Sequence, residues 1–197
     1  HYHRGTAGEL AAQDDAVLRT QLADFRRAGL ALQLHADLAA VQWGKLLLNL
    51  NNPVNALSGL PLRAQLMDRG YRLCLAALQT EALGVLRAAG IQPAQVGALP
   101  PQRIPPLLRL PTPLFRLIAA RMLRIDPKAR SSMADDLAQG RTTEIDALCG
   151  EVVRLAATRG LRAPLNARMV ALVDAWPQRP QAMNSREMRA ALLQSHS

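Results

Sequence analysis

The sequence predicts a mainly α-helical protein that begins with a small strand–helix–strand unit. Hydrophobic residues make up 49% of the 197 residues but aromatic residues only 3%, so the core must be built from Leu, Ala, Val and Ile. Such a composition favours helices. From Ala36 onward, apolar residues recur at helical spacing, whereas the pattern before Ala36 alternates strand, helix and strand. A chain of this length can bury a substantial core, in one or two domains.

The first 35 residues carry the strand–helix–strand pattern. The stretch through Gly5 and Gly8 to Ala12 is short and Gly-punctuated, and is consistent with a strand pair. Asp14 or Asp15 can cap a helix that ends at Gly29. The apolar positions of this helix are Val17, Leu18, Leu22 and Phe25. The run 30–34 is predicted to form the next strand. We expect one unit of an α/β sheet, which is too small to form a sheet domain by itself.

The rest of the chain is predicted to be helical, with breaks at Gly and Pro. The predicted helices cover residues 37–51, 62–89, 114–125, 131–139, 142–159 and 164–176. Asn52-Pro53 is expected to end the first of them, because a residue before Pro avoids the helical conformation. The segment 92–113 holds seven prolines and is predicted to be an extended connection rather than an element. After Pro180 the chain turns polar, and we expect this tail to fray.

Composition and patterning exclude several classes of protein. No apolar run reaches the ~20 residues that a membrane-spanning helix needs, and no signal peptide is evident. The formal net charge is +9, but the arginines are dispersed and few aromatic residues accompany them, so we expect no nucleic-acid partner. The histidines give no metal-ligand spacing, so no metal site is expected. Cys74 and Cys149 are interpreted as buried thiols of a cytoplasmic protein, with a disulfide as the less favoured alternative.

Lys45 is the first candidate for chemistry, because only two of the 24 basic residues are lysines and this one lies in an apolar run. A desolvated lysine amine can lose and regain a proton, whereas arginine stays charged. Lys45, Asn49 and Asn52 stand at i, i+4 and i+7, so they share one face of a helix. An amine flanked by carboxamides suits a small polar anion. The alternatives are a solvated lysine and a structural polar network between packed helices.

A second group of polar residues lies around the turn between two later helices. Ser131 or Ser132 stands at a helix start, where a hydroxyl beside free backbone N–H groups can hold a carboxylate. Glu144 lies in the first turn of the next helix, where the helix dipole favours its charge. The alternative is simple helix capping, which explains serine and threonine at such positions without any ligand. The sequence has no nucleophile elbow, P-loop or Gly-x-Gly-x-x-Gly run.

Both groups belong to longer sequence blocks. The blocks are Trp43-x-Lys45-Leu46-x-x-Asn49…Asn52-Pro53…Ala56-Leu57 and Ser131-Ser132-Met133-x-x-Asp136-Leu137…Gly140-Arg141-x-Thr143-Glu144-Ile145-Asp146…Gly150, followed by Pro164-x-Asn166. In content, order and separation they resemble the C-terminal half of the ketopantoate reductase (2-dehydropantoate 2-reductase) family. The resemblance runs from Gly5 to about Val173. It implies a helical domain of the 6-phosphogluconate-dehydrogenase-like type, preceded by the end of a dinucleotide-binding α/β domain.

The resemblance also implies a role for each candidate residue. Lys45 matches the catalytic lysine that protonates the keto oxygen of the substrate as hydride arrives. Asn49 and Asn52 match asparagines that contact the substrate, and Ser132 matches the serine that holds its carboxylate. Glu144 matches the acid that contacts the nicotinamide cofactor and supports the active site. The implied reaction is the NADPH-dependent reduction of 2-dehydropantoate to (R)-pantoate, in the pathway to pantothenate and coenzyme A.

The sequence departs from the family pattern in three places. The interval from Lys45 to Pro53 is one residue shorter, and a further substrate asparagine falls near Leu62, with Asn51 or Asn55 as alternatives. Another branched 2-oxo acid is therefore an alternative substrate. The Gly-rich phosphate loop is absent, so we expect the chain as given to bind NADPH poorly and to turn over little.

The resemblance divides the chain into three parts. They are residues 1–35, a C-terminal remnant of an NADP-binding α/β domain; residues 36–180, a helical substrate-binding and catalytic domain; and residues 181–197, a polar tail. The expected partners are a small 2-oxo acid and a second copy of the chain, bound through the helical domain. A non-catalytic helical dimerisation or interaction module is the alternative from another functional class.

Overall fold

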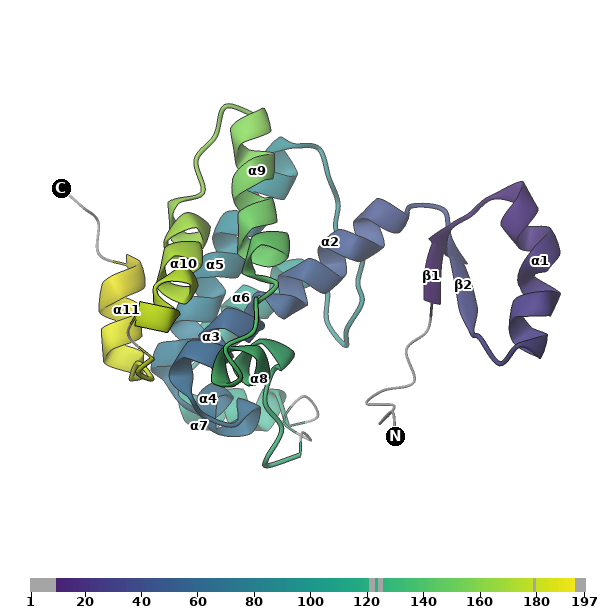
Figure 1. The fold of residues 1–197 in the computed structure, drawn as a ribbon. Coiled ribbons are helices and arrows are strands. Elements are labelled where there is room, and N and C mark those ends of the chain that lie inside the picture. Colours follow the sequence, from purple (N-terminus) through teal and green to yellow (C-terminus); the bar gives the residue numbers. More distant parts are fainter. Residues whose placement is uncertain (1–9, 121–122, 124–125, 179, 194–197) are drawn as a thin grey trace.

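The computed structural model describes residues 10–120, 123, 126–178 and 180–193. In that part, two strands and α1 lie to one side of a helical body, and α2 joins the two (Figure 1). The elements in chain order are β1 (Leu10–Gln13), α1 (Ala16–Arg27), β2 (Leu32–His35), α2 (Leu38–Asn49), α3 (Asn51–Ser58), α4 (Leu62–Met67), α5 (Arg69–Ala88), η1 (Pro101–Arg103), α6 (Ile104–Arg109), α7 (Thr112–Ile118), α8 (Ser132–Ala138), the π-helical η2 (Asp146–Gly150), α9 (Glu151–Thr158), α10 (Pro164–Asp174), η3 (Trp176–Gln178) and α11 (Ser185–Leu193). The predicted fold class is confirmed.

The sheet consists of β1 and β2, which run parallel. Leu10 lies opposite Leu32 and Gln13 lies opposite His35, and α1 forms the crossover between the strands. The predicted second strand is confirmed with a shift toward its C-terminal side. Of the stretch that the sequence suggested for a strand pair, residues 10–12 belong to the single strand β1, whereas Gly5 and Gly8 lie outside the described residues.

Helix α1 follows the local signals of its sequence. The Asp15 carboxylate accepts the N–H of Val17 at 2.8 Å and caps the first turn. Gly29, with φ +72°, ends the segment in the left-handed conformation that glycine tolerates best. No residue of α1 is buried, and Val17 is 63% exposed. The helix therefore covers the sheet only loosely.

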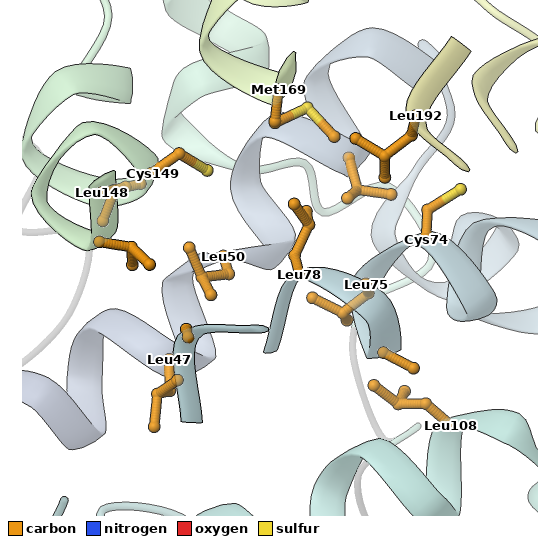
Figure 2. Close-up of a cluster of buried hydrophobic side chains, with 14 of the residues drawn as sticks. Leu47, Leu50, Cys74, Leu75, Leu78, Leu108, Leu148, Cys149, Met169 and Leu192 are labelled. Atoms are coloured by element: carbon orange, nitrogen blue, oxygen red, sulfur yellow. The ribbon is translucent and has the colours of Figure 1, made fainter. Parts of the chain in front are cut away.

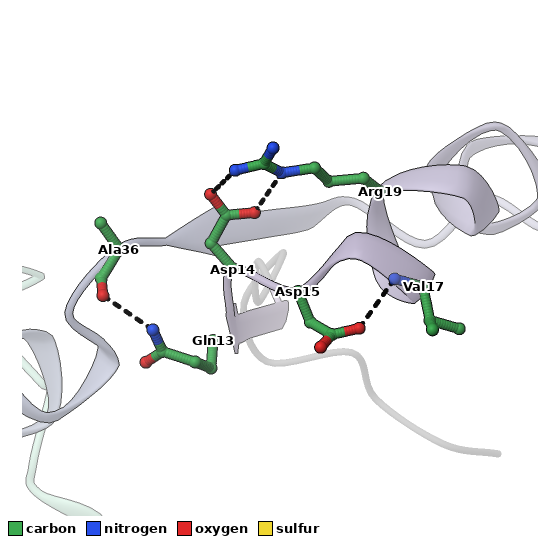
Figure 3. Close-up of polar contacts among 6 residues, drawn as sticks. All are labelled: Gln13, Asp14, Asp15, Val17, Arg19 and Ala36. Carbon is green, nitrogen blue, oxygen red and sulfur yellow. Dashed lines mark hydrogen bonds and ion pairs between the residues drawn. The ribbon is translucent and has the colours of Figure 1, made fainter.

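The turn after β1 ties the strand unit to α2 (Figure 3). The Gln13 side chain donates to the carbonyl of Ala36 at 2.7 Å and accepts the N–H of Leu38 at 3.1 Å. This single amide therefore holds the end of β1 against the start of α2. Beside it, the Arg19 guanidinium donates to the Asp14 carboxylate with an Nε–Oδ1 distance of 2.6 Å, and this hydrogen bond lowers the pKa of Asp14 below its usual value.

The helical body is organised around α5. Helices α3, α4, α6, α9, α10 and α11 all pack against it. The core is almost entirely aliphatic, as the low aromatic content predicts. Figure 2 shows part of this core, which brings together residues from α2, α5, α6, η2, α10 and α11: Leu47, Leu50, Cys74, Leu75, Leu78, Leu108, Leu148, Cys149, Met169 and Leu192. Both cysteines are free and buried.

Asn52-Pro53 does not end the helical stretch, and that prediction is wrong. The interruption lies at Leu50, between α2 and α3, and Pro53 is the third residue of α3. In the first turn of a helix the missing N–H of proline is not needed, so α3 tolerates it. The Gln79 side chain on α5 donates to the carbonyl of Leu47 at 2.9 Å and fixes the end of α2.

The predicted helix 62–89 is two helices, because Asp68 caps a new helix inside it. The Asp68 carboxylate accepts the N–H of Gly70 at 2.7 Å, and α5 begins there. Gly90, with φ +73°, follows the end of α5 as predicted. Asp68 is an N-cap residue within an otherwise continuous helical pattern, and its capping hydrogen bond gives the physical reason for the break.

The proline-rich segment is only partly an extended connection. Residues 91–100 have no regular structure, but η1 and α6 occupy 101–109, contrary to the prediction. Pro105 and Pro106 fall in the first turn of α6, where prolines are compatible with a helix. Helix α7 begins near the predicted start, and its predicted end falls among residues 121–125, most of which lie outside the described part.

The Arg72 side chain joins three helices of the body although it is completely buried. Its guanidinium donates to the carbonyls of Leu66 at 2.9 Å, Leu108 at 3.1 Å and Leu110 at 2.9 Å. These carbonyls belong to the ends of α4 and α6, where helix geometry leaves acceptors without partners. The ring of Phe115 on α7 lies 4.2 Å from the guanidinium carbon, close enough for a cation–π contact.

The expected fraying after Pro180 is wrong for residues 185–193, which form α11. Met188 and Leu192 of α11 are fully buried in the core. The hydroxyl of Tyr71 donates to the carbonyl of Met183 at 2.8 Å, so α5 also holds the segment before α11. This polar stretch therefore contains a helix, and its two buried apolar residues, Met188 and Leu192, are spaced four apart on one side of it.

Candidate functional site

The row Lys45, Asn49 and Asn52 lies on the outer face of α2 and the start of α3. Lys45 and Asn49 are exposed and Asn52 is partly exposed, whereas Leu47 and Leu50 between them are buried in the core. Lys45 and Asn49 therefore stand on the other side of α2 from the buried leucines, whereas Asn52 follows the interruption at Leu50, and the face that all three share stays a prediction. We call these three residues the polar row.

Helix α8 docks beside the polar row through Ser131. The backbone N–H of Ser131 donates to Oδ1 of Asn55 at 2.9 Å, and the Ser131 hydroxyl donates to the carbonyl of Asn52 at 3.2 Å. Asn55 is fully buried and its amide donates to the carbonyl of Leu60 at 2.9 Å. The structure thus brings the start of α8, with Ser132, to the Asn52 end of the polar row.

The structure distinguishes Ser131 from Ser132, which the sequence left as alternatives for capping the helix. Ser131 is the cap of α8, because its hydroxyl accepts the N–H of Ala134 at 3.2 Å. Ser132 is exposed, and its hydroxyl has no hydrogen bond to any described residue. Capping explains Ser131 but not Ser132. Within residues 10–120, 123, 126–178 and 180–193, the side chains of Lys45 and Asn49 are equally unpaired, so all three are available to a ligand.

Glu144 lies at the start of the segment that leads into η2. Its carboxylate is exposed, and no described side chain forms an ion pair or hydrogen bond with it. One turn later, Leu148 enters the core in the same cluster as Leu47 and Leu50 (Figure 2). The π-helical geometry of η2 is a feature that often occurs at functional sites. Among the described residues, Glu144 forms no hydrogen bond or ion pair with Lys45 or Ser132, so its role stays a prediction.

The alternative substrate asparagines have different surroundings. Asn55 is wrong as a substrate contact, because its amide oxygen and nitrogen are both used inside the protein and no part of it is exposed. Asn51 is half-buried, and its Oδ1 has no partner among the described residues. Leu62 is the first residue of α4. Asn55 is instead a structural residue that sequence reasoning missed, since its partner is 76 positions away.

The clearest pockets of the described surface lie away from the candidate residues. One of about 310 Å³ is bounded by Leu57, Trp176 and Met183, and one of about 480 Å³ by Thr80 and Arg109. The polar row is therefore an exposed surface in this chain. Within the described part, no group of His, Cys, Asp and Glu has a metal-binding arrangement, and no helix has the length and apolar character needed to cross a membrane.

A family model described as "Ketopantoate reductase PanE/ApbA C terminal" matches residues 37–176, which include α2 and the site segments. The chain belongs to this family. The 2-dehydropantoate 2-reductase of Caulobacter vibrioides is 31% identical over 151 residues, covering 77% of this chain and 46% of the relative. The chain therefore spans about half the length of the curated relative that it matches.

Solved structures of the family have the same fold. The PanE/ApbA family ketopantoate reductase of Ralstonia eutropha JMP134 is 28% identical, with a TM-score of 0.66 over 87% of this chain and 52% of that chain. The dimeric ketopantoate reductase of Staphylococcus aureus is 20% identical, with a TM-score of 0.64 over 85% of this chain and 53% of that chain.

The fold extends to a second kind of enzyme. A D-mandelate dehydrogenase, solved in a ternary complex with NADH and anilino(oxo)acetate, is 17% identical with a TM-score of 0.60. The match covers 86% of this chain and 85% of that enzyme. The Staphylococcus aureus reductase and the D-mandelate dehydrogenase are both less than 25% identical to this chain, so these two similarities show a shared fold alone.

Proposed function

We propose that the chain is the substrate-binding helical part of an NADPH-dependent reductase that converts 2-dehydropantoate to (R)-pantoate. Family membership supports the reaction class. The observation that carries the proposal is the polar row: Lys45 and Asn49 stand exposed and unpaired above a rigid apolar helix face, and Ser132 is held at its end. Structural polar networks are satisfied by protein partners, whereas these groups have none among the described residues.

Each side chain has a chemical task on a 2-oxo acid. The Lys45 ammonium donates a proton to the keto oxygen as that oxygen becomes an alkoxide. The amides of Asn49 and Asn52 orient the substrate, and the Ser132 hydroxyl donates to its carboxylate. Glu144 contacts the nicotinamide cofactor and supports the site. Positioning these donors where charge develops is the main contribution that this part of the protein makes to catalysis.

The described strand unit does not fit the phosphates of a dinucleotide. The turn from β1 to α1 reads Gln13-Asp14-Asp15, so it carries two carboxylates and none of the glycines that let a backbone approach a pyrophosphate. Asp15 also accepts the N–H of Val17, one of the amides that a pyrophosphate would use. The chain therefore supplies the substrate side of the reaction, and we expect residues 1–197 alone to bind NADPH weakly and show little turnover.

Another branched 2-oxo acid is the second candidate substrate, because the sequence departs from the family pattern in the segment that follows Lys45. A homodimer formed through the helical domain is proposed as the assembly. Its support is the dimeric relative and the exposed apolar residues of α7, Leu114, Leu117 and Ile118. Leu117→Glu should then convert a dimer to a monomer in sedimentation experiments, and a monomeric unchanged chain would refute it.

The free buried cysteines support a reducing compartment, the cytoplasm.

The proposal can be tested without a cofactor, because the chain has only two lysines. Lys45 and Lys128 are both exposed, so an acetylating reagent modifies both, and peptide mass spectrometry measures each rate. 2-Dehydropantoate should slow the acetylation of Lys45 and leave that of Lys128 unchanged. The half-protecting concentration is the concentration of 2-oxo acid that halves the acetylation rate of Lys45. In Ser132→Ala it should rise about tenfold, which corresponds to a loss of about 1.4 kcal/mol of binding free energy. If saturating 2-oxo acid leaves the acetylation rate of Lys45 unchanged, the proposal is rejected in favour of a non-catalytic helical module.

A further inference from the structure

The loop between α5 and α6 lies directly against α2, the helix that carries the polar row. Figure 1 shows this connection running past α2. The N–H of Ala94 donates to the carbonyl of Ala40 at 2.8 Å, which is an interelement backbone hydrogen bond. Further along α2, the loop lies against Gly44, and its Gly97 lies near the Leu48 side chain, since a Cβ added at Gly97 would be 3.7 Å from it. The contacts at 40, 44 and 48 recur every four residues, so the loop follows one side of the helix.

Gly44 makes this approach possible. A Cβ at position 44 would lie 2.3 Å from the carbonyl oxygen of Ala94 and 2.8 Å from Cγ2 of Val96. Both distances are shorter than real contacts allow, and the first involves backbone. Only glycine fits, so the loop is seated at a fixed place on α2, one residue before Lys45.

The loop presents an apolar edge next to the polar row. Residues 44 and 48 precede Lys45 and Asn49 by one position each, so the two rows are neighbours around the helix. Val96 contacts Gly44 and is still 41% exposed, and Leu48 is partly exposed. The loop therefore lies on the side of α2 next to the one that carries Lys45 and Asn49.

We propose that Val96, together with Leu48, forms the wall beside the organic substituent of the keto carbon (the group other than the oxygen and the carboxylate), and that this wall favours branched, uncharged substituents. The inference rests on the proposed function, because it assumes that the keto acid lies on the polar row. An apolar flank gains free energy from an apolar substituent, and it leaves a charged one desolvated and unpaired. Val96 is thus a specificity-determining residue on a loop, while the anchoring groups lie on helices.

The test uses Lys45 protection with two probes, 2-oxoisovalerate and 2-oxoglutarate, which differ in the organic substituent of the keto carbon. The unchanged chain should be protected more strongly by 2-oxoisovalerate. In Val96→Arg, the half-protecting concentration of 2-oxoglutarate relative to that of 2-oxoisovalerate should fall by at least about tenfold, the scale of a single pocket contact. The matched control is Val17→Arg, which adds the same charge at an exposed valine on α1, and it should leave the ratio unchanged.

The outcomes separate this inference from the proposed function. If no 2-oxo acid protects Lys45 in the unchanged chain, the proposed function fails and the inference falls with it. If 2-oxoisovalerate protects but Val96→Arg and Val17→Arg give the same ratio, only the role of Val96 is overturned. Should Val96→Arg lose its helical circular dichroism, Val96→Ala replaces it. That variant should reduce the preference for 2-oxoisovalerate over straight-chain 2-oxobutyrate, and an unchanged preference overturns the inference.

Discussion

The strand unit and the helical body differ in how they use apolar residues. In α1 no residue is buried, and Val17 and Leu10 are 63% and 46% exposed. In α5, buried residues occur along the whole helix, and Leu78 is completely enclosed. A two-stranded sheet covered by one helix is only marginally stable, whereas α5, which packs against six other helices, belongs to a well-stabilised core. The body therefore holds the global stability, and the strand unit should open at lower cost.

Polar residues differ between buried and exposed positions in the same way. Arg72, Asn55 and Asn166 are fully buried and are hydrogen-bonded to distant parts of the chain. Lys45 and Ser132 are exposed and unpaired among the described residues. The buried set builds the scaffold and the exposed set is free for chemistry. Mutations in the two sets should consequently be separable, with stability lost in one and ligand binding lost in the other.

The largest effect is expected from Arg72→Met. The substitution keeps much of the side-chain volume but leaves the carbonyls of Leu66, Leu108 and Leu110 without their donor. Each buried acceptor left unpaired costs on the order of 1–3 kcal/mol, so we expect a total of about 4 kcal/mol. Urea unfolding followed by circular dichroism measures it. Arg87→Met on the same helix is the control, since Arg87 is exposed, and a similar loss in both variants would contradict the assignment.

Asn55→Leu should have the next largest effect, about 2–3 kcal/mol, because the N–H of Ser131 and the carbonyl of Leu60 lose a buried partner. The damage should centre on the junction of α3 and α8. Hydrogen exchange should therefore increase at the start of α8 and Lys45 protection should weaken. Asn166→Leu is the matched control, because it removes an equally buried amide next to Glu81 and α10. Equal loss of protection in both variants would remove the special role of Asn55.

Local signals allowed much of the fold to be predicted. Asp15 and Gly29 bound α1, and Gly140 and Gly160 follow α8 and α9, because caps and left-handed glycines act within a few residues. Predictions failed where tertiary contacts decide. Pro53 was expected to end the predicted helix 37–51 but lies in the first turn of the next helix, α3. Helix α11 was missed because its stability comes from packing on α5.

The candidate site shows the same division. Helical spacing was enough to separate Lys45 and Asn49, which are exposed, from the buried Leu46 and Leu47 of the same helix. Spacing could not decide between Ser131 and Ser132, because the answer depends on hydrogen bonds to α3. The seating of the 91–100 loop on Gly44 was also beyond reach, since contacts about 50 residues apart leave no local pattern.

A smaller effect should appear at alkaline pH and only in the body. Burial raises the pKa of Cys74 and of Cys149 to about 12, from an ordinary value of 9.0. Because the folded pKa is raised, the folded state binds more protons above pH 9, and stability falls as pH rises toward 12. Between pH 8 and pH 10 we expect a loss of about 1 kcal/mol for each thiol. Urea unfolding of Cys149→Ala should show a correspondingly smaller loss, and an unchanged pH dependence would argue against burial of that thiol.

The smallest and most local effect is expected from Gln13→Ala, which cuts the tie between the strand unit and α2. Its amide makes two hydrogen bonds, to Ala36 and from Leu38, in an exposed place where each contributes at most about 1 kcal/mol. Hydrogen exchange should rise in β1 and at the first turn of α2, while α5 keeps its protection. Gln21→Ala, at an exposed position on α1, serves as control. If exchange in α5 rises as well, the strand unit and the body unfold as one cooperative structure, and the contrast between them lies in exposure but not in stability.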